Sequence, residues 1–462
     1  MSQIMGRFPS RREAIGALAL LPALSLRAEE PIEFRLSTFQ AEVTIPNGHP
    51  CMGGGIKPAS KIEDPLYALG FVLRGAEKPI VYVAVDWCEI RNDAYERWRT
   101  VLAEAAGTDP VRVLVSALHQ HDAPVVDLTA QKLLQQHSAK GAICDLDFHE
   151  KAVQRVAKAV KASLAKSIPV THLGVGQAKV EKVASNRRYI DENGKVQYNR
   201  MSASRDAKIR AGEEGTIDPY LKTLSFWSGA TPVLALNAYA THPMSFYGRG
   251  EVSADFVGMA RKRRQADDPK ILQIYASGCS GNVTAGKYND GSLENRPVLA
   301  ERIYSAMKSA WADTKKHQLT KISFRSVPLN LEARGGAGFT EADLTKRLKE
   351  DARPFGQCLA ALGLSWRARV EAGKPIDLPV IEFGPALFAI LPAESYVEYQ
   401  LLAQKLRPDS FVVVAGYGEC GPGYIPIERA WKEGDGNLND WCWVAPGSER
   451  RMTEALTKAM KN

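Results

Sequence analysis

The amino-acid sequence predicts an α/β protein with a mixed or largely parallel sheet, flanking helices and a single large domain. Apolar runs of strand length alternate with amphipathic helical patterns from about residue 71 to the C-terminus. No low-complexity tract, internal repeat or long Pro/Gly/Ser linker divides the chain. Hydrophobic residues make up 45% and charged residues 24% of the sequence, which predicts an ordinary globular core. We therefore expect one domain over residues 29–462.

The expected strands and helices follow from the spacing of apolar residues. Between residues 148 and 164, Val153, Val156, Val160 and Leu164 recur at helical spacing, while lysines occupy the other face. Strands are expected at residues 80–85, 111–116, 233–239, 271–276, 387–391 and 411–415. Helices are expected at residues 93–106, 148–164, 297–312, 341–349, 396–406 and 448–460. Residues 189–214 are rich in turn formers and are expected to leave the sheet as an excursion.

The N-terminus has the pattern of a signal peptide over residues 1–28. Arg11 and Arg12 precede an apolar stretch at residues 14–26, and the small residue Ala28 follows two positions later, as at a signal cleavage site. The stretch is too short to span a bilayer, which takes about 20 apolar residues. The paired arginines favour the twin-arginine route, and a frayed basic N-terminus is the alternative. We expect an exported protein, periplasmic or secreted.

Charge and cysteine content exclude several classes of protein. The net charge of +8 falls to about +5 without the first 28 residues, and the basic residues are scattered. The densest basic run, residues 261–264, is expected on the solvated face of a helix. We therefore expect no nucleic-acid partner, and no other segment is long and apolar enough to cross a membrane. The seven cysteines are widely spaced and form no CxxC pair, so neither a disulfide framework nor cysteine-based zinc binding is expected.

Potential metal ligands follow several of the expected strands, where functional groups collect in α/β sheets. His119 and His121 come after one strand and would face the same way, roughly 6.6 Å apart, if the strand continued. His242 follows a second strand, Glu394 a third, and Tyr424 lies in a glycine-rich loop after a fourth. Each has an ordinary structural explanation; Glu394, for example, would complement the N-terminus of the next helix. Together they supply the mixed nitrogen and oxygen donors that suit zinc.

These segments resemble, in sequence order and over nearly the entire mature chain, the neutral (neutral/alkaline, non-lysosomal) ceramidase family. The stretch SALHQHDAP at residues 116–124 is similar to the family's ATHTHSGP signature. The other similar segments are residues 50–55, 186–188, 241–243, 252–255, 281–286, 392–394 and 423–426. The resemblance implies the fold of the family's catalytic domain, without its C-terminal β-sandwich. It also implies a Zn²⁺ cofactor held by His119, His242, Glu394 and Tyr424.

The resemblance also implies the catalytic residues. His121 would stand beside the metal, Arg187 would hold a polar group of the substrate, and Tyr424 would help to stabilise developing charge. Thr284 takes the place of a serine at the family's reacting centre, as a nucleophile or, as we favour, a residue that positions substrate. Asp122 adds a charge where the family has serine.

The function that the resemblance implies is zinc-dependent hydrolysis of a carbon–nitrogen amide bond, of the N-acylsphingosine amidohydrolase type, with metal-bound hydroxide as the nucleophile. The substrate would be a lipid or small-molecule amide, and a lipid substrate would bring the protein into transient contact with a membrane surface. One alternative is a zinc hydrolase of esters, small N-acyl compounds or carbohydrate-derived substrates. An alternative of another class is an exported, non-catalytic protein that binds zinc or a ligand on the same scaffold.

Overall fold

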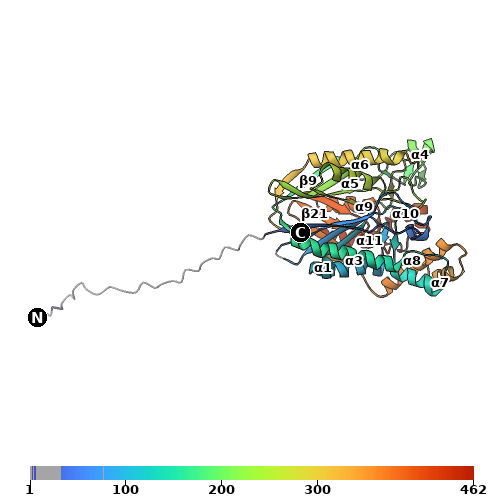
Figure 1. Cartoon of the computed structure of the whole chain (residues 1–462), viewed down its shortest axis with the longest axis horizontal. Coiled ribbons are helices and arrows are strands. Elements are labelled where there is room, and N and C mark those ends of the chain that lie inside the picture. The colour runs from blue at the N-terminus through green and yellow to red at the C-terminus, as the bar shows by residue number, and fades with distance from the viewer. Residues whose placement is uncertain (1–2, 4, 7–32, 76, 462) are drawn as a thin grey trace. The chain divides into compact units, whose positions relative to one another are not determined.

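Three mixed sheets form the framework of the protein, and the chain builds each of them in the same order (Figure 1). Three antiparallel strands are followed by a helix, by a fourth strand parallel to the third, and by a second helix. The computed structural model describes residues 3, 5–6, 33–75 and 77–461, and Glu33–Asn462 form one compact unit. The predicted α/β class is confirmed. The sequence has no repeated residue pattern, but the structure contains a repeated order of strands and helices, which the sequence analysis did not predict.

The bounds of the repeated elements are as follows. Unit 1 contains β1 (Arg35–Glu42), β3 (Tyr67–Arg74), β4 (Ile80–Val85), α1 (Asn92–Ala106), β6 (Val113–Ala117) and α3 (Leu146–Ser163). Unit 2 contains β9 (His172–Lys179), β13 (Tyr220–Ser228), β14 (Thr231–Tyr239), α5 (Asp255–Asp267), β16 (Leu272–Ser277) and α6 (Asn295–Ala312). Unit 3 contains β19 (Ser323–Leu329), β20 (Ile376–Glu382), β21 (Ala386–Ile390), α9 (Val397–Leu406), β23 (Phe411–Ala415) and α11 (Ser448–Met460).

Shorter elements connect these, and two of them, β8 (Ile168–Pro169) and β18 (Lys315–Gln318), add an edge strand to the sheets of units 1 and 2. The other short strands are β2 (Lys61–Ile62), β5 (Glu89–Ile90), β7 (Val125–Val126), β10 (Ser185–Asn186), β11 (Tyr189–Ile190), β12 (Val196–Gln197), β15 (Glu251–Val252), β17 (Val283–Thr284), β22 (Glu394–Ser395) and β24 (Tyr424–Ile425). The connecting helices are α2 (Leu128–Gln136), α4 (Ala207–Ala211), α7 (Glu341–Glu350), α8 (Pro354–Glu371) and α10 (Glu428–Glu433). The 3₁₀ turns are Met52–Gly54, Pro110–Arg112, Leu164–Lys166 and Gly436–Leu438.

The inner faces of the three sheets meet in one apolar core. Aromatic contacts join the units in pairs: ring centroids lie 5.6 Å apart for Phe71 and Phe226, 5.5 Å for Phe226 and Phe383, and 4.9 Å for Tyr82 and Phe388. The outer faces are covered by α1 and α3, by α5 and α6, and by α9 and α11 (Figure 1). Strands buried on both faces have continuous apolar sequences, which is why these runs stood out in the sequence.

Every strand and helix expected at a stated range is present, with bounds shifted by at most two residues. The sequence analysis did not identify the first two strands of each unit, or α2 and α8. These strands include polar and glycine residues, as in β9 with its sequence HLGVGQAK, so no continuous apolar run marks them. The excursion at residues 189–214 carries the paired strands β11 and β12 and the helix α4.

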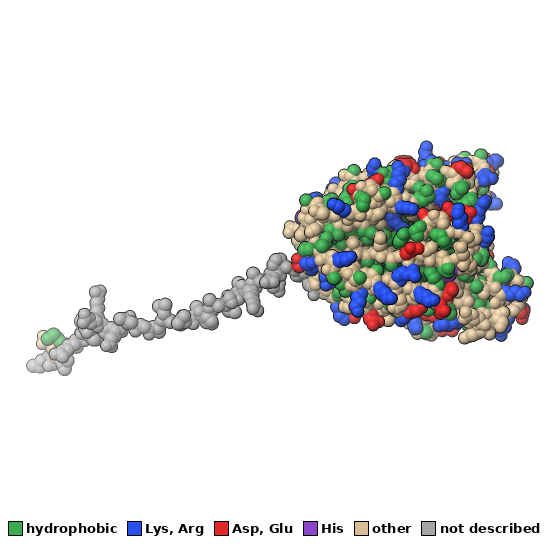
Figure 2. All heavy atoms as spheres, viewed as in Figure 1, with side chains coloured by type: hydrophobic (Ala, Val, Ile, Leu, Met, Phe, Trp, Pro, Cys, Tyr) green, Lys and Arg blue, Asp and Glu red, His purple; other side chains and the backbone are tan. Residues whose placement is uncertain are grey.

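The basic run at residues 261–264 is a correction to the sequence analysis. Lys262 and Arg263 are exposed as expected, but Arg261 and Arg264 are buried. The Arg261 guanidinium makes two hydrogen bonds of 2.6 Å to Asp86, at the end of β4. Residues three apart share one helix face, so two of the four side chains are buried together. Arg264 pairs with Asp268, directly after its own helix. Elsewhere, basic and acidic side chains are interspersed on the face drawn in Figure 2.

Several expectations concern other parts of the chain. All seven cysteines lie in the described part of the chain, where they are buried and free. Among the residues that the structure describes, no helix combines the length and hydropathy needed to cross a bilayer. Most of the expected signal peptide, including Arg11 and Arg12, lies outside the described residues.

Candidate metal centre

Each of the three units contributes one potential metal ligand from a loop that follows a strand. His119 follows β6 of unit 1, His242 follows β14 of unit 2, and Glu394 follows β21 of unit 3. All three side chains are buried, and one ligand atom from each lies within 4.8 Å of the others. Glu394 Oε2 is 3.0 Å from His242 Nε2 and 3.4 Å from His119 Nε2. The three units therefore converge on one cluster of metal-binding atoms.

The backbone at His119 differs from the extended geometry that the sequence suggested. The strand ends at Ala117, and His119 adopts a left-handed conformation with φ of 69°. Its backbone N–H donates to the Trp87 carbonyl, which holds this unfavourable conformation in place. His119 and His121 therefore do not project from one continuous strand. Their rings still meet, with centroids 5.4 Å apart.

Backbone carbonyls orient both buried imidazoles. His119 Nδ1 donates to the Cys88 carbonyl at 3.0 Å, and His242 Nδ1 donates to the Ser280 carbonyl at 2.5 Å. When Nδ1 carries the proton, Nε2 presents its lone pair, and in both residues Nε2 faces Glu394. Among the described residues, no well-aligned hydrogen bond engages His119 Nε2, and Glu394 Oε2 lies 3.4 Å from it. Imidazoles held in this way by a second group are typical of metal ligands in proteins, so these residues fit a divalent metal.

The electrostatics of the cluster favour a bound cation. Burial alone would raise the pKa of Glu394, but His119 and His242 outweigh it and the pKa is lowered, so the side chain is a carboxylate. Burial and the nearby Arg187 lower the pKa of His242 to about 4, which keeps that imidazole neutral. Burial also lowers the pKa of His119, but the Glu394 carboxylate reverses this effect and raises it. A buried carboxylate beside imidazole nitrogens is a suitable ligand set for zinc.

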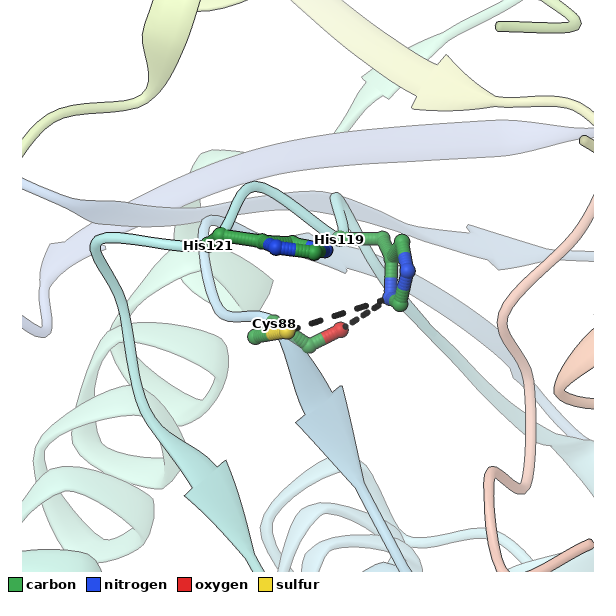
Figure 3. Close-up of side chains that lie close together, drawn as sticks. All are labelled: Cys88, His119 and His121. Carbon is green, nitrogen blue, oxygen red and sulfur yellow. Dashed lines mark hydrogen bonds between the residues drawn. The ribbon is translucent and has the colours of Figure 1, made fainter. Parts of the chain in front are cut away.

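A second group of ligand atoms, Cys88, His119 and His121, is drawn in Figure 3. Cys88 Sγ lies 3.9 Å from His119 Nδ1, the atom that already donates to the Cys88 carbonyl. Burial, together with the carboxylates of Glu89 and Glu394, raises the pKa of the Cys88 thiol well above its usual range. A thiol must ionise to bind zinc, so the cluster around Glu394 is the better metal site.

Tyr424 and Arg187 lie against this cluster. Tyr424 is opposite Glu394 in the parallel pair of β22 and β24, and its hydroxyl accepts a 2.7 Å hydrogen bond from Arg187 Nη1. The Arg187 guanidinium carbon is 5.3 Å from the centre of the Tyr424 ring. Burial raises the pKa of Tyr424 despite the arginine, so the phenol is protonated in this arrangement. The structure thus brings Tyr424 beside Glu394.

Thr284 is fully buried, and backbone groups engage its hydroxyl. Oγ1 donates to the Met201 carbonyl at 2.8 Å and accepts from the Gly286 N–H at 3.1 Å. The residue before it, Val283, accepts a hydrogen bond from the backbone N–H of His242. Thr284 therefore belongs to the loop structure that supports His242.

The sequence analysis did not identify Tyr417 and Tyr247. The Tyr417 ring stacks on His119 with centroids 4.2 Å apart, and its hydroxyl is 2.7 Å from Ser280 Oγ. Tyr417 lies two residues after β23, as His119 does after β6, and both have positive φ. Comparing the spacing after the two strands would have identified Tyr417. Tyr247 lies in an irregular loop and gave no such signal.

Comparisons with known proteins identify solved structures of similar fold. A scan of protein-family models gives no match, and a search of curated proteins gives none either. Among solved structures, the neutral ceramidase from Pseudomonas aeruginosa is similar, with a TM-score of 0.68 at 17% identity, covering 93% of this chain and 74% of that one. A structure described as ceramidase complexed with C2 has a TM-score of 0.67 at 16% identity, covering 93% and 75%. The chain therefore has a neutral-ceramidase-like fold, as the sequence motifs predicted.

Proposed function

We propose that this protein, which has the fold of neutral ceramidases, is a zinc-dependent hydrolase that cleaves a carbon–nitrogen amide bond. The observation that carries the proposal is the convergence of His119, His242 and Glu394, one from each unit, with Nε2 of both imidazoles facing the Glu394 carboxylate. The proposed substrate is an amide, either a lipid of the N-acylsphingosine type or a small molecule.

The proposed ligands are His119, His242 and Glu394, with Tyr424 beside them. Two imidazoles, a carboxylate and a phenol are the mixed nitrogen and oxygen donors that zinc accepts. Bound zinc would supply a Lewis acid that polarises a carbonyl group and lowers the pKa of water to about 7. The buried carbonyl partners of His119 and His242 keep both Nε2 atoms aimed at the same point.

The neighbouring side chains have roles that follow from their contacts. Burial and the two nearby imidazoles lower the pKa of His121 well below its usual value, so the ring is neutral and serves as a hydrogen-bond partner that steadies the developing oxyanion. Arg187 is a buried cation that polarises the Tyr424 hydroxyl and attracts a polar group of the substrate. Thr284 is assigned a positioning role and not that of the nucleophile, because backbone groups engage its hydroxyl. It holds in place the loop that supports His242.

Metal analysis combined with a hydrolysis panel tests this proposal. The panel contains N-acylsphingosines of several chain lengths, short N-acyl amides and carboxylic esters. We expect about one zinc per chain, turnover of at least one amide, and loss of turnover with a strong chelator that added zinc restores. Zinc without turnover across the panel would instead favour a non-catalytic binding protein. Full activity in metal-free protein would contradict the proposal.

Export is proposed on the N-terminal sequence. If the twin-arginine route is used, replacing Arg11 and Arg12 with lysine should retain the protein in the cytoplasm. Unchanged export of this double variant would instead indicate the general secretory route.

A further inference from the structure

His121 differs from the other two histidines of the cluster in what holds its ring. His119 and His242 each donate from Nδ1 to a backbone carbonyl. Within residues 33–75 and 77–461, no hydrogen bond orients the His121 ring, and its Nδ1 is buried without a partner. The orientation of His121 must therefore come from packing.

Tyr247 makes the shortest ring contact with His121. The two centroids are 4.8 Å apart with an interplanar angle of 79°, the edge-to-face geometry that aromatic pairs favour. The corresponding distances to His119 and His242 are longer, at 5.4 and 6.3 Å. Tyr247 is partly exposed, whereas the other two rings belong to buried residues. His121 is therefore in contact with buried ligands and with an outer aromatic ring.

The loop that carries Tyr247 is anchored by Asp122, the residue next to His121. Asp122 is buried, and its Oδ2 and Oδ1 accept hydrogen bonds from the Gly248 and Gly250 N–H groups, each at 3.0 Å. Both glycines have left-handed backbones, with φ of 92° and 73°, so side chains at these positions would strain the loop. The carboxylate therefore ties the Tyr247 loop directly to the loop of His121.

We propose that Tyr247 is a positioning residue for His121 and that Asp122 holds Tyr247 in place. The catalytic role of His121 in this inference rests on the proposed function. Asp122 provides the anchor because its two oxygens satisfy two backbone donors at once, which an uncharged alanine cannot do. Without the ring of Tyr247, the imidazole gains rotational freedom. A catalytic group misplaced by about 1 Å costs up to about 10²-fold in rate.

Steady-state kinetics of the mature, zinc-loaded enzyme test this inference. Tyr247→Ala should lower kcat by about 10²-fold with a smaller change in KM, while zinc content and Tm stay unchanged. Tyr247→Phe keeps the ring and should stay within a few-fold of the wild type. Asp122→Ala should resemble Tyr247→Ala, and Asp122→Asn, which keeps one acceptor oxygen, should be milder. Tyr220→Ala is the matched control, because Tyr220 is 42% exposed on β13.

Chemical modification tests the same inference without relying on turnover. Diethylpyrocarbonate acylates accessible neutral imidazoles, and peptide mass mapping reports each histidine separately; the exposed His137 and His317 serve as references. We expect faster acylation of His121 in Tyr247→Ala and in Asp122→Ala, but not in Tyr247→Phe. Wild-type acylation rates in both alanine variants would overturn the proposal, as would an unchanged kcat in Tyr247→Ala. A kcat loss as large in Tyr247→Phe as in Tyr247→Ala would overturn the role of the ring. If no substrate is turned over, the proposed function fails. The acylation rates then still test whether Tyr247 and Asp122 hold the His121 ring in place.

Discussion

Glu89 in unit 1 and Glu394 in unit 3 occupy corresponding places in the repeated topology, yet they have different surroundings. Each begins a two-residue strand after the third strand of its sheet, and each such strand pairs in parallel with a short strand that follows the fourth. Both carboxylates are buried. Glu89 is 2.6 Å from Arg91 and accepts a 3.1 Å hydrogen bond from Trp441 Nε1. The basic partners of Glu394 are two imidazoles.

The difference shows what separates a structural carboxylate from a metal-binding one in the same backbone setting. Burial raises the pKa of Glu89, and the Arg91 cation opposes that effect. The arginine 2.6 Å away therefore balances the charge of this carboxylate. Around Glu394 no arginine supplies a salt bridge within the described residues, and no well-aligned hydrogen bond engages His119 Nε2. The charge of Glu394 is balanced by the two imidazoles alone, and a metal bound by all three residues would stabilise it further.

The largest expected effect concerns the histidines of the metal cluster. His119→Ala should abolish zinc binding and turnover together, because it removes one of three buried ligands. His121→Ala should keep most of the zinc but lower kcat by about 10²–10³-fold, the usual cost of a lost transition-state hydrogen bond. Zinc content measured beside rate distinguishes the two. Loss of zinc only in His121→Ala would reverse the roles, and full activity in both variants would place the site elsewhere.

Exchanging each glutamate for glutamine tests the comparison directly. Glu394→Gln should lose zinc while the apo fold remains. Glu89→Gln should keep zinc, since the Cys88 carbonyl still orients His119. It should be destabilised by up to about 3–5 kcal/mol, because the buried Arg91 loses its 2.6 Å partner and keeps only the more distant carboxylate of Asp127, at 3.8 Å. Denaturant unfolding and metal analysis measure the two effects. Equal zinc loss in both variants would remove the distinction between the two glutamates.

Metal removal should destabilise the whole domain, since one ligand comes from each unit. At a free zinc concentration of about 10³ times Kd, binding stabilises the folded state by about 4 kcal/mol. A chelator should therefore lower the Tm of the wild type and of Glu89→Gln. Glu394→Gln serves as the control and should not respond. A Tm insensitive to chelation in the wild type would mean that the metal does not link the three units.

A smaller effect, on the pH dependence of the unfolding free energy, is expected from His149. This imidazole is buried on α3, and no salt bridge to a carboxylate within the described residues opposes its burial as Glu394 does for His119. Burial lowers the pKa of His149 to about 4. The unfolded chain takes up the proton near pH 6.5 and the folded chain does not, so stability falls as the pH drops from about 6.5 to about 4. At pH 5.5 the loss is about 1.4 kcal/mol. His149→Phe should reduce the slope of unfolding free energy against pH; an unchanged slope would assign the dependence to other groups.

The sequence by itself determined the α/β class, twelve of the strands and helices, and a set of candidate metal ligands after the strands. These features are local: continuous apolar runs mark strands buried on both faces, and polar residues after such strands mark the edge where functional groups collect. The family motifs added the expected fold, which the structural comparison confirmed.

Only the tertiary structure decided which of these polar residues act together. The threefold topology brings His119, His242 and Glu394 to one point, although more than a hundred residues separate each from the next along the chain. It also neutralises Glu89 with Arg91, buries Arg261 against Asp86, and places Tyr247 on His121. No local pattern encodes these pairings, because each depends on how loops from different units pack. Whether a buried charge is paired or left to bind a metal is a property of that packing.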